Sequence, residues 1–161
     1  MSFIAFDAAK RSTGWAWRDR AGEWHTGVVR PDDTEALRAI LETALENGVT
    51  EAVIEQCFLG KNVYTLKALQ EAQTRIVVQC EWYGLPVTLV HPATWQAAFE
   101  ITGDSWDRKL GAKVIAKRIG CDTQIGDIAD AVCLCEYQTK HGLQMELELK
   151  GPRGGKMWGR R

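Results

Sequence analysis

Short apolar segments bounded by turn residues alternate along this chain with longer segments in which apolar residues recur at helical spacing. Short segments rich in β-branched and aromatic residues, closed by Gly, Pro, Asp or Asn, are typical of strands. Three such segments follow one another at the start of the chain, and Asp19–Gly22 supplies a turn between the second and the third. The predicted strands are Ser2–Phe6, Thr13–Trp17, Trp24–Val29, Ala52–Ile54 and Pro86–Val90.

Apolar residues three and four positions apart predict the helices. Turn and capping residues mark their ends, with Asp32 and Asp33 before the first helix and Gly48 after it. This order of strands and helices indicates a mixed α/β sheet with helices on its faces, because a strand that follows a helical crossover lies parallel to its predecessor. The predicted helices are one from Leu37 to Leu45, one over Val63–Tyr83, one capped by Ser105 and ended by Gly120, and one over about Asp127–Lys140.

Length and composition are those of a single globular domain. The chain has 161 residues, 45% of them hydrophobic and 25% charged, which is enough to bury a core without disulfides or metals. No apolar run is long enough for a membrane span or a signal peptide. The five cysteines form no C-x-x-C pair, so we expect free thiols in a reducing compartment rather than disulfides or a zinc site. These features predict a soluble intracellular protein without membrane contact.

Charge is unevenly distributed between the body of the chain and its end. Five basic residues and no acid fall within 150–161, so the other 149 residues carry 15 basic against 21 acidic residues. We therefore expect a domain over residues 1–149 followed by a basic, flexible tail over 150–161. That tail either adds phosphate contacts or is a solvated terminus. The acidic body requires another reason, such as carboxylates gathered to hold cations.

Four carboxylates stand where such a cluster could form. Asp7 and Glu55 each follow a buried strand, and the carboxyl ends of parallel strands meet at the edge where α/β sheets bind ligands. Asp127 and Asp130 lie three residues apart at a helix start, hence on one face. Taken singly, each acid could be a helix cap, a helix-dipole partner or a strand end. Together they favour a site for Mg²⁺ or Mn²⁺, which prefer oxygen ligands.

Three segments resemble RuvC-type Holliday junction resolvases, a family with a ribonuclease H-like fold in the retroviral integrase superfamily. They are Asp7–Gly14, Ile54–Asn62 and Asp127–Ala131, and the similarity spans about residues 3 to 140. One departure is Ala8-Ala9, where the family commonly has Pro-Gly. The resemblance implies a mixed five-stranded sheet, with a three-strand antiparallel meander plus two parallel strands, flanked by helices.

The resemblance also implies a metal-dependent active site. Asp7, Glu55, Asp127 and Asp130 would hold two Mg²⁺ ions per site, with Asp7 bridging them, and Mn²⁺ would support activity as well. Such a site hydrolyses a phosphodiester by in-line displacement and leaves 5′-phosphate and 3′-hydroxyl ends. A basic residue would offset charge on the scissile phosphate. Gln96 stands where the family has one lysine, so that role is vacant or moved. For the second basic position of the family the candidates are Lys109, which we favour, and Arg108, with Lys113 a weaker candidate. An exposed basic helix face is the alternative for these residues.

Residues that follow Glu55 are candidates for DNA contact. The resemblance implies that Phe58 stacks on or wedges between bases at the junction centre, since an aromatic face replaces lost base stacking. An ordinary core position is the alternative for Phe58. Lys61 and Asn62 would then lie near the phosphate backbone.

These features together predict an endonuclease that resolves four-way (Holliday) DNA junctions by paired symmetric cuts in the cytoplasm of a bacterial or phage-infected cell. Two symmetric cuts require a two-fold homodimer, for which the Val63–Tyr83 helix is the candidate interface, although a core helix has the same pattern. Two alternatives stay open. One is a ribonuclease H-like nuclease acting on other branched DNA, RNA or hybrids, and the other is a junction-binding protein without catalysis.

Overall fold

The computed structural model of the protein describes residues 2–58 and 62–149, with residues 143–149 described by their helical backbone. The described residues form five strands and five helices. The elements follow in the order β1 (Phe3–Asp7), β2 (Thr13–Arg18), β3 (Trp24–Val29), α1 (Thr34–Glu46), β4 (Glu51–Glu55), α2 (Val63–Trp82), β5 (Val87–Val90), α3 (Pro92–Ala98), α4 (Ser105–Arg118) and α5 (Gly126–Leu149).

A mixed sheet with the strand order β3-β2-β1-β4-β5 forms the centre of the molecule. The strands β1, β2 and β3 are antiparallel, whereas β4 and β5 continue the sheet parallel to β1. In this register Phe6 lies beside Ile54 and Asp7 lies opposite Gly14. The carboxyl ends of β1 and β4, with Asp7 and Glu55, therefore meet at one edge. The predicted mixed five-stranded sheet is confirmed.

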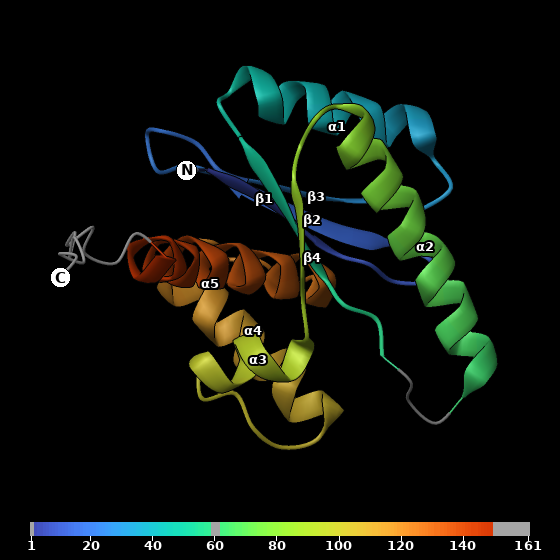
Figure 1. Cartoon of the computed structure of the whole chain (residues 1–161). Helices are drawn as coiled ribbons and strands as arrows, with labels where there is room; N and C mark the ends of the chain where they lie inside the picture. Colours follow the sequence, from blue (N-terminus) through green and yellow to red (C-terminus); the bar gives the residue numbers. More distant parts are fainter. Residues whose placement is uncertain (1, 59–61, 150–161) are drawn as a thin grey trace, which may run out of the picture.

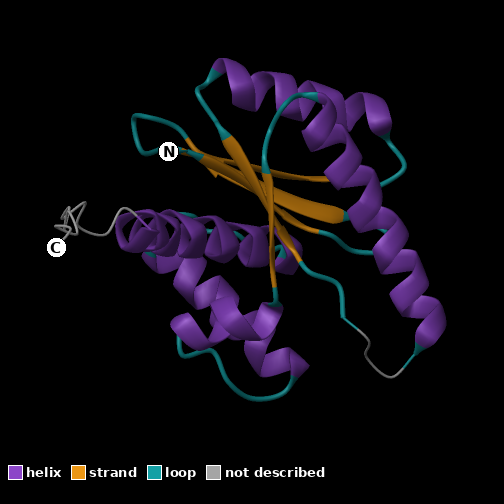
Figure 2. Ribbon diagram, viewed as in Figure 1, coloured by secondary structure: helices purple, strands orange, loops and turns teal. Residues whose placement is uncertain are grey.

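Helices cover both faces of this sheet, and the result is three layers (Figures 1 and 2). The helices α1 and α2 pack on the face that carries Ile4 and Phe6 of β1. The other face, with Phe3 and Ala5, packs against α3, α4 and α5. Because β1 is buried on both faces, it is apolar at every position up to Asp7. None of the described helices is long and apolar enough to cross a membrane.

Three local predictions differ from the structure. The helix α3 was not predicted, because Pro92 closes the preceding strand but also occupies the first turn of a new helix, with His91 as the N-cap. The expected cap Ser105 is wrong, since Asp104 accepts the N–H groups of Trp106 and Asp107. The final helix α5 continues past Lys140 to Leu149.

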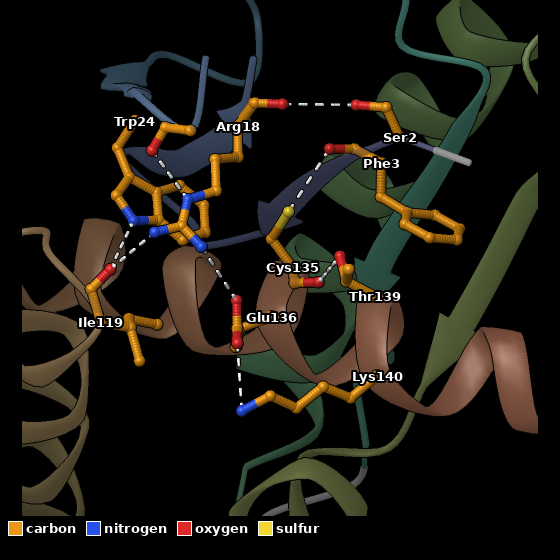
Figure 3. A network of polar contacts seen from close by, with 10 residues as sticks. Ser2, Phe3, Arg18, Trp24, Ile119, Cys135, Glu136, Thr139 and Lys140 are labelled. Atoms are coloured by element: carbon orange, nitrogen blue, oxygen red, sulfur yellow. Dashed lines mark hydrogen bonds and ion pairs between the residues drawn. The ribbon is translucent and has the colours of Figure 1, made fainter. Parts of the chain in front are cut away.

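A polar network holds α4 and α5 to the end of the sheet that is remote from Asp7 (Figure 3). Arg18 Nη2 and Trp24 Nε1, from β2 and β3, both donate to the carbonyl of Ile119 after α4, at 3.1 and 3.0 Å. The Glu136 carboxylate of α5 pairs with Arg18 at 3.7 Å and with Lys140 at 3.0 Å. These contacts fix the orientation of α5, the helix whose other end carries Asp127 and Asp130.

Close packing of glycine positions the first turn of α5 on β2. A Cβ placed on Gly14 would overlap the carbonyl group of Asp127 and come within 2.9 Å of the nitrogen of Ile128. Both obstacles are backbone, so they cannot move aside as a flexible side chain would. Gly14 therefore determines how close Asp127 lies to Asp7, its neighbour across the strands.

We expect Gly14→Ala to destabilise the protein by about 3 kcal/mol or more, because overpacking at backbone atoms forces α5 away from the sheet. At this chain length that corresponds to a fall in Tm of roughly 2–4 °C per kcal/mol. The matched control is Gly84→Ala, where φ is +71° and no atom lies within 4 Å of the added Cβ. That control should lose only the left-handed strain of about 1–2 kcal/mol. Equal losses, measured by circular dichroism, would contradict the close contact between α5 and β2.

Candidate active site

The structure brings the four predicted carboxylates together at one edge of the sheet. Asp7 ends β1, Glu55 ends the neighbouring β4, and Asp127 and Asp130 lie at the start of α5. The negative charges of Glu55, Asp130 and Asp127 all raise the pKa of Asp7. Residues separated by more than a hundred positions thus share one electrostatic environment.

Asp7 is the most deeply buried of these acids, with 8% of its surface exposed. Burial raises the pKa of Asp7 well above its ordinary value, the three neighbouring carboxylates raise it further, and only the charge of Lys109 opposes them. A carboxylate in this position ionises readily only when additional positive charge is brought to it.

Trp95 of α3 holds Glu55. The indole Nε1 of Trp95, a side chain only 1% exposed, donates to Glu55 Oε2 at 2.8 Å. The pKa of Glu55 is raised to about 7, chiefly by burial and also by the charge of Asp130, although the hydrogen bond from Trp95 and the charge of Lys109 lower it. Trp95 therefore fixes one oxygen of this carboxylate and favours its ionised form.

Lys109 of α4 lies between the two carboxylates of α5. Its Nζ donates to Asp127 Oδ1 at 3.1 Å and to Asp130 Oδ2 at 3.4 Å, while Ser12 Oγ donates to Asp127 Oδ2 at 2.9 Å. Burial raises the pKa of Asp130 to about 6, although Lys109 lowers it. Burial alone would lower the pKa of Lys109, but the charges of Asp130, Asp127 and Asp7 raise it above its ordinary value. The ammonium thus neutralises part of the acid cluster.

The donor set fits a hard divalent cation. As the side chains of the described residues lie, no three acidic, His or Cys groups already form a ligand set for one ion, and Lys109 provides the positive charge between Asp127 and Asp130. All four acids offer only oxygen donors, which Mg²⁺ and Mn²⁺ prefer. Their negative charge exceeds that of one ammonium, and the buried Asp7 is the least compensated. Asp7, Glu55, Asp127 and Asp130 are therefore the residues that could hold such ions.

Two predicted DNA contacts, Phe58 and Asn62, follow β4 in the chain. Phe58, three residues after Glu55, is 50% exposed, and its ring lies near the His91 ring, with centroids 5.4 Å apart. Its alternative interpretation as a core residue is therefore wrong. Asn62 caps α2, its Oδ1 accepting the N–H groups of Tyr64 and Thr65 at 2.9 and 3.4 Å. Lys61 lies outside the described residues, as does the basic tail.

The three basic candidates all lie on α4, but they differ in position. Lys109 contacts the carboxylates directly. Lys113, one turn later, is near enough for its charge to lower the pKa of Asp130. Arg108 is exposed, and its Nε donates to the carbonyl of Asp104 at 3.3 Å. Of these three residues, Lys109 is the one best placed to act at the acid cluster.

Three residues that support the site were not identified as such from the sequence. Trp95 lies on the helix that was not predicted, so no pattern connected it with Glu55. Ser12 and Gly14 belong to a segment that carries the family resemblance, but the resemblance does not indicate what these two residues contact. Their partner, Asp127, is more than a hundred residues away in the chain.

Comparison with protein-family models and with curated proteins finds no match by sequence. Among solved structures, Thermus thermophilus RuvC, alone and in complex with a Holliday junction substrate, matches with a TM-score of 0.64 at 16% identity, over 88% of this chain and 97% of that chain. The yeast mitochondrial Holliday junction resolvase Ydc2 has a TM-score of 0.54 at 9% identity, over 89% and 80%. The expected ribonuclease H-like fold, as in RuvC, is therefore confirmed.

We expect the metal-free protein to lose stability as pH rises from 5 to 8. The folded-state pKa of Glu55 is raised from 4.5 to about 7, so its contribution is fully present below pH 4.5 and is lost as pH rises through 7. Glu55→Gln should reduce this dependence of Tm on pH, measured in EDTA, by several degrees. The control Glu35→Gln, at the exposed start of α1, should not change it. An unchanged dependence in Glu55→Gln would contradict the assigned burial of Glu55.

Proposed function

We propose that this protein is a metal-dependent endonuclease that resolves four-way DNA junctions. The observation that carries the proposal is the cluster of four carboxylates with one lysine at the carboxyl edge of a ribonuclease H-like sheet. A protein that only bound phosphates would gain nothing from this negative charge, because it repels the ligand. A nuclease that requires divalent cations accounts for both the acids and the burial of Asp7.

Each polar residue of the site has a distinct task in this proposal. Asp7, Glu55, Asp127 and Asp130 would hold two Mg²⁺ ions, with Mn²⁺ as a substitute. When bound, these ions supply Lewis-acid activation of water and of the scissile phosphate. Trp95 and Ser12 orient Glu55 and Asp127 through the hydrogen bonds described above. Lys109 offsets negative charge at the phosphate as the in-line displacement leaves a 5′-phosphate and a 3′-hydroxyl.

Selectivity for junctions is assigned to the segment after β4. Phe58, three residues after Glu55, exposes half of its surface, and an exposed aromatic ring can stack on a base that has lost its neighbour at the branch point. Lys61 and Asn62 would contact the backbone next to it. The T. thermophilus RuvC structure that this fold resembles contains a Holliday junction substrate, which supports a branched substrate for this chain.

Two symmetric cuts require a two-fold dimer, and we propose that α2 forms its interface. The side chains Ala72, Ile76 and Cys80 are buried within the monomer, so this face of α2 packs on the rest of the same chain. Outside that buried face, the last turn of α2 exposes 77% of Trp82. Trp82 is the proposed anchor of the dimer, because a large exposed apolar group is typical of interfaces.

We expect Asp7→Asn to abolish cleavage while junction binding persists, because the amide cannot supply the charge that holds the cations. In EDTA this variant should have a higher Tm than the wild type, since it removes a buried carboxylate from three others. Added Mg²⁺ or Mn²⁺ should raise the Tm of the wild type and have a smaller effect on the variant. Tm therefore tests the metal site independently of activity.

The cleavage assay compares a labelled four-way junction with a plain duplex, a flap, an RNA–DNA hybrid and RNA at one salt concentration. Paired symmetric nicks in the junction alone, lost in EDTA, are the expected result. Cutting of every substrate alike would contradict junction selectivity and favour a general nuclease of this fold. Tight binding without cutting by the wild type would contradict the enzyme and favour a junction-binding protein.

We expect Lys109→Ala to reduce the cleavage rate by roughly 10²–10³, the cost of losing one charge-stabilising donor at the reacting group. Because the ammonium no longer competes for Asp127 and Asp130, half-saturation of the Mn²⁺-induced rise in Tm should occur at the same or a lower concentration. Lys117→Ala is the control, since this lysine of the same helix pairs with Asp122 at 3.1 Å. Wild-type rates for Lys109→Ala would exclude Lys109 from catalysis.

A further inference from the structure

A cleft of about 450 Å³ opens between the loop that joins β1 to β2, the start of the connection from β3 to α1, and one side of α2. Its charged lining residues come from all three segments, and we refer to it as the Lys10 cleft. They are Lys10, Arg11, Arg30, Asp32, Glu71 and Arg75.

We propose that the Lys10 cleft binds the phosphodiester backbone of the nucleic acid whose neighbouring phosphate lies in the active site. This inference rests on the proposed function and adds a binding site to it. The chemical class of the ligand is a run of phosphate groups, which is shared by duplex and branched substrates.

The charge of the Lys10 cleft favours a phosphate ligand. Four cationic side chains face two carboxylates in the cleft, whereas acidic residues predominate in the rest of residues 1–149. Two of the cations are already paired. Arg30 donates to Asp32 at 3.1 and 2.8 Å, and Arg75 donates to Glu71 at 2.9 Å. Lys10 and Arg11 have no acidic partner among the described residues, so two positive charges are available to a ligand.

The position of Lys10 and Arg11 in the chain also favours this ligand. Lys10 and Arg11 belong to the loop that begins after Asp7 and includes Ser12, whose hydroxyl donates to Asp127 at 2.9 Å. A strand with one phosphate at the acid cluster would therefore have its adjoining phosphates within reach of these two cations. The repulsion that four carboxylates exert on a polyanion makes nearby cations necessary for binding.

The size of the cleft and the arginines on its walls also suit a phosphate backbone. A volume near 450 Å³ is in the range of pockets that hold small ligands, and it admits a sugar-phosphate unit rather than a single ion. Arg30 and Arg75 line its walls, each paired with a carboxylate of the cleft. Planar guanidinium groups suit bidentate contact with phosphate once such a carboxylate no longer occupies them.

The test uses the full chain with Asp7→Asn as the background, in EDTA, so that binding is measured without cleavage. Affinity for a labelled four-way junction and for a duplex of the same sequence is determined by fluorescence anisotropy at several salt concentrations. Adding Lys10→Ala and Arg11→Ala together should weaken binding on the order of tenfold and reduce the salt slope by roughly 1–2. Arg20→Ala is the control, because this arginine lies in the turn between β2 and β3, at the opposite end of the sheet.

A second pair of variants predicts a gain, which misfolding cannot imitate. Asp32→Asn and Glu71→Gln release Arg30 and Arg75 from their internal partners. Together they should tighten binding and steepen the salt slope. Unchanged affinity in both pairs of variants would overturn the proposal that the cleft binds the phosphodiester backbone.

The outcomes separate the cleft from the proposed function. If the protein binds the junction more tightly than the duplex, but the affinity of Lys10→Ala/Arg11→Ala equals that of Arg20→Ala, the cleft is not a phosphate-binding site. The resolvase proposal then stands. If junction and duplex bind equally and both are weakened by the double variant, the cleft is supported and junction selectivity fails. If sedimentation shows that the double variant changes the oligomeric state with no change in salt slope, the cleft is a protein contact and the inference is overturned.

Discussion

The burial of Asp7 at the end of the central strand is the constraint on which the rest of the site depends. The strand β1 must be apolar on both faces to lie between two helical layers, and its last residue ends with little access to water. Three more carboxylates reach the same edge and increase the electrostatic cost of ionising it. Positive charge is therefore a condition for the ionised form of this arrangement: Lys109 supplies part of it, and in the proposed function divalent cations would supply the rest.

The placement of helix α5 at this site depends on contacts in distant parts of the molecule. Its first turn can lie against β2 only because Gly14 has no side chain. Farther along, Glu136 is tied to Arg18 of β2 and to Lys140 of the same helix. The positions of Asp127 and Asp130 consequently depend on contacts at both ends of the sheet.

Positive charges lie on two segments that reach the acid cluster. Lys109 and Lys113 lie on α4, and Lys10 and Arg11 lie on the loop after β1. A polyanionic substrate can approach an acidic site only along such cations, because the bare carboxylates repel it. In the proposed function, one set of charges assists catalysis and the other holds the adjoining backbone.

Local sequence was enough to determine the strands, most helices and the candidate acids. Alternation and apolar runs mark β1 and β4, and Asp7 and Glu55 end them, so the parallel register brings both acids together. The tertiary structure alone decided that Trp95 holds Glu55, 40 residues away, and that Ser12 holds Asp127, 115 residues away. It also decided that Phe58 is exposed and that Ile76 and Cys80 of α2 face the core. Periodicity reports which face of an element is apolar, but only packing determines which neighbour covers that face, because contacts between distant segments leave no local pattern.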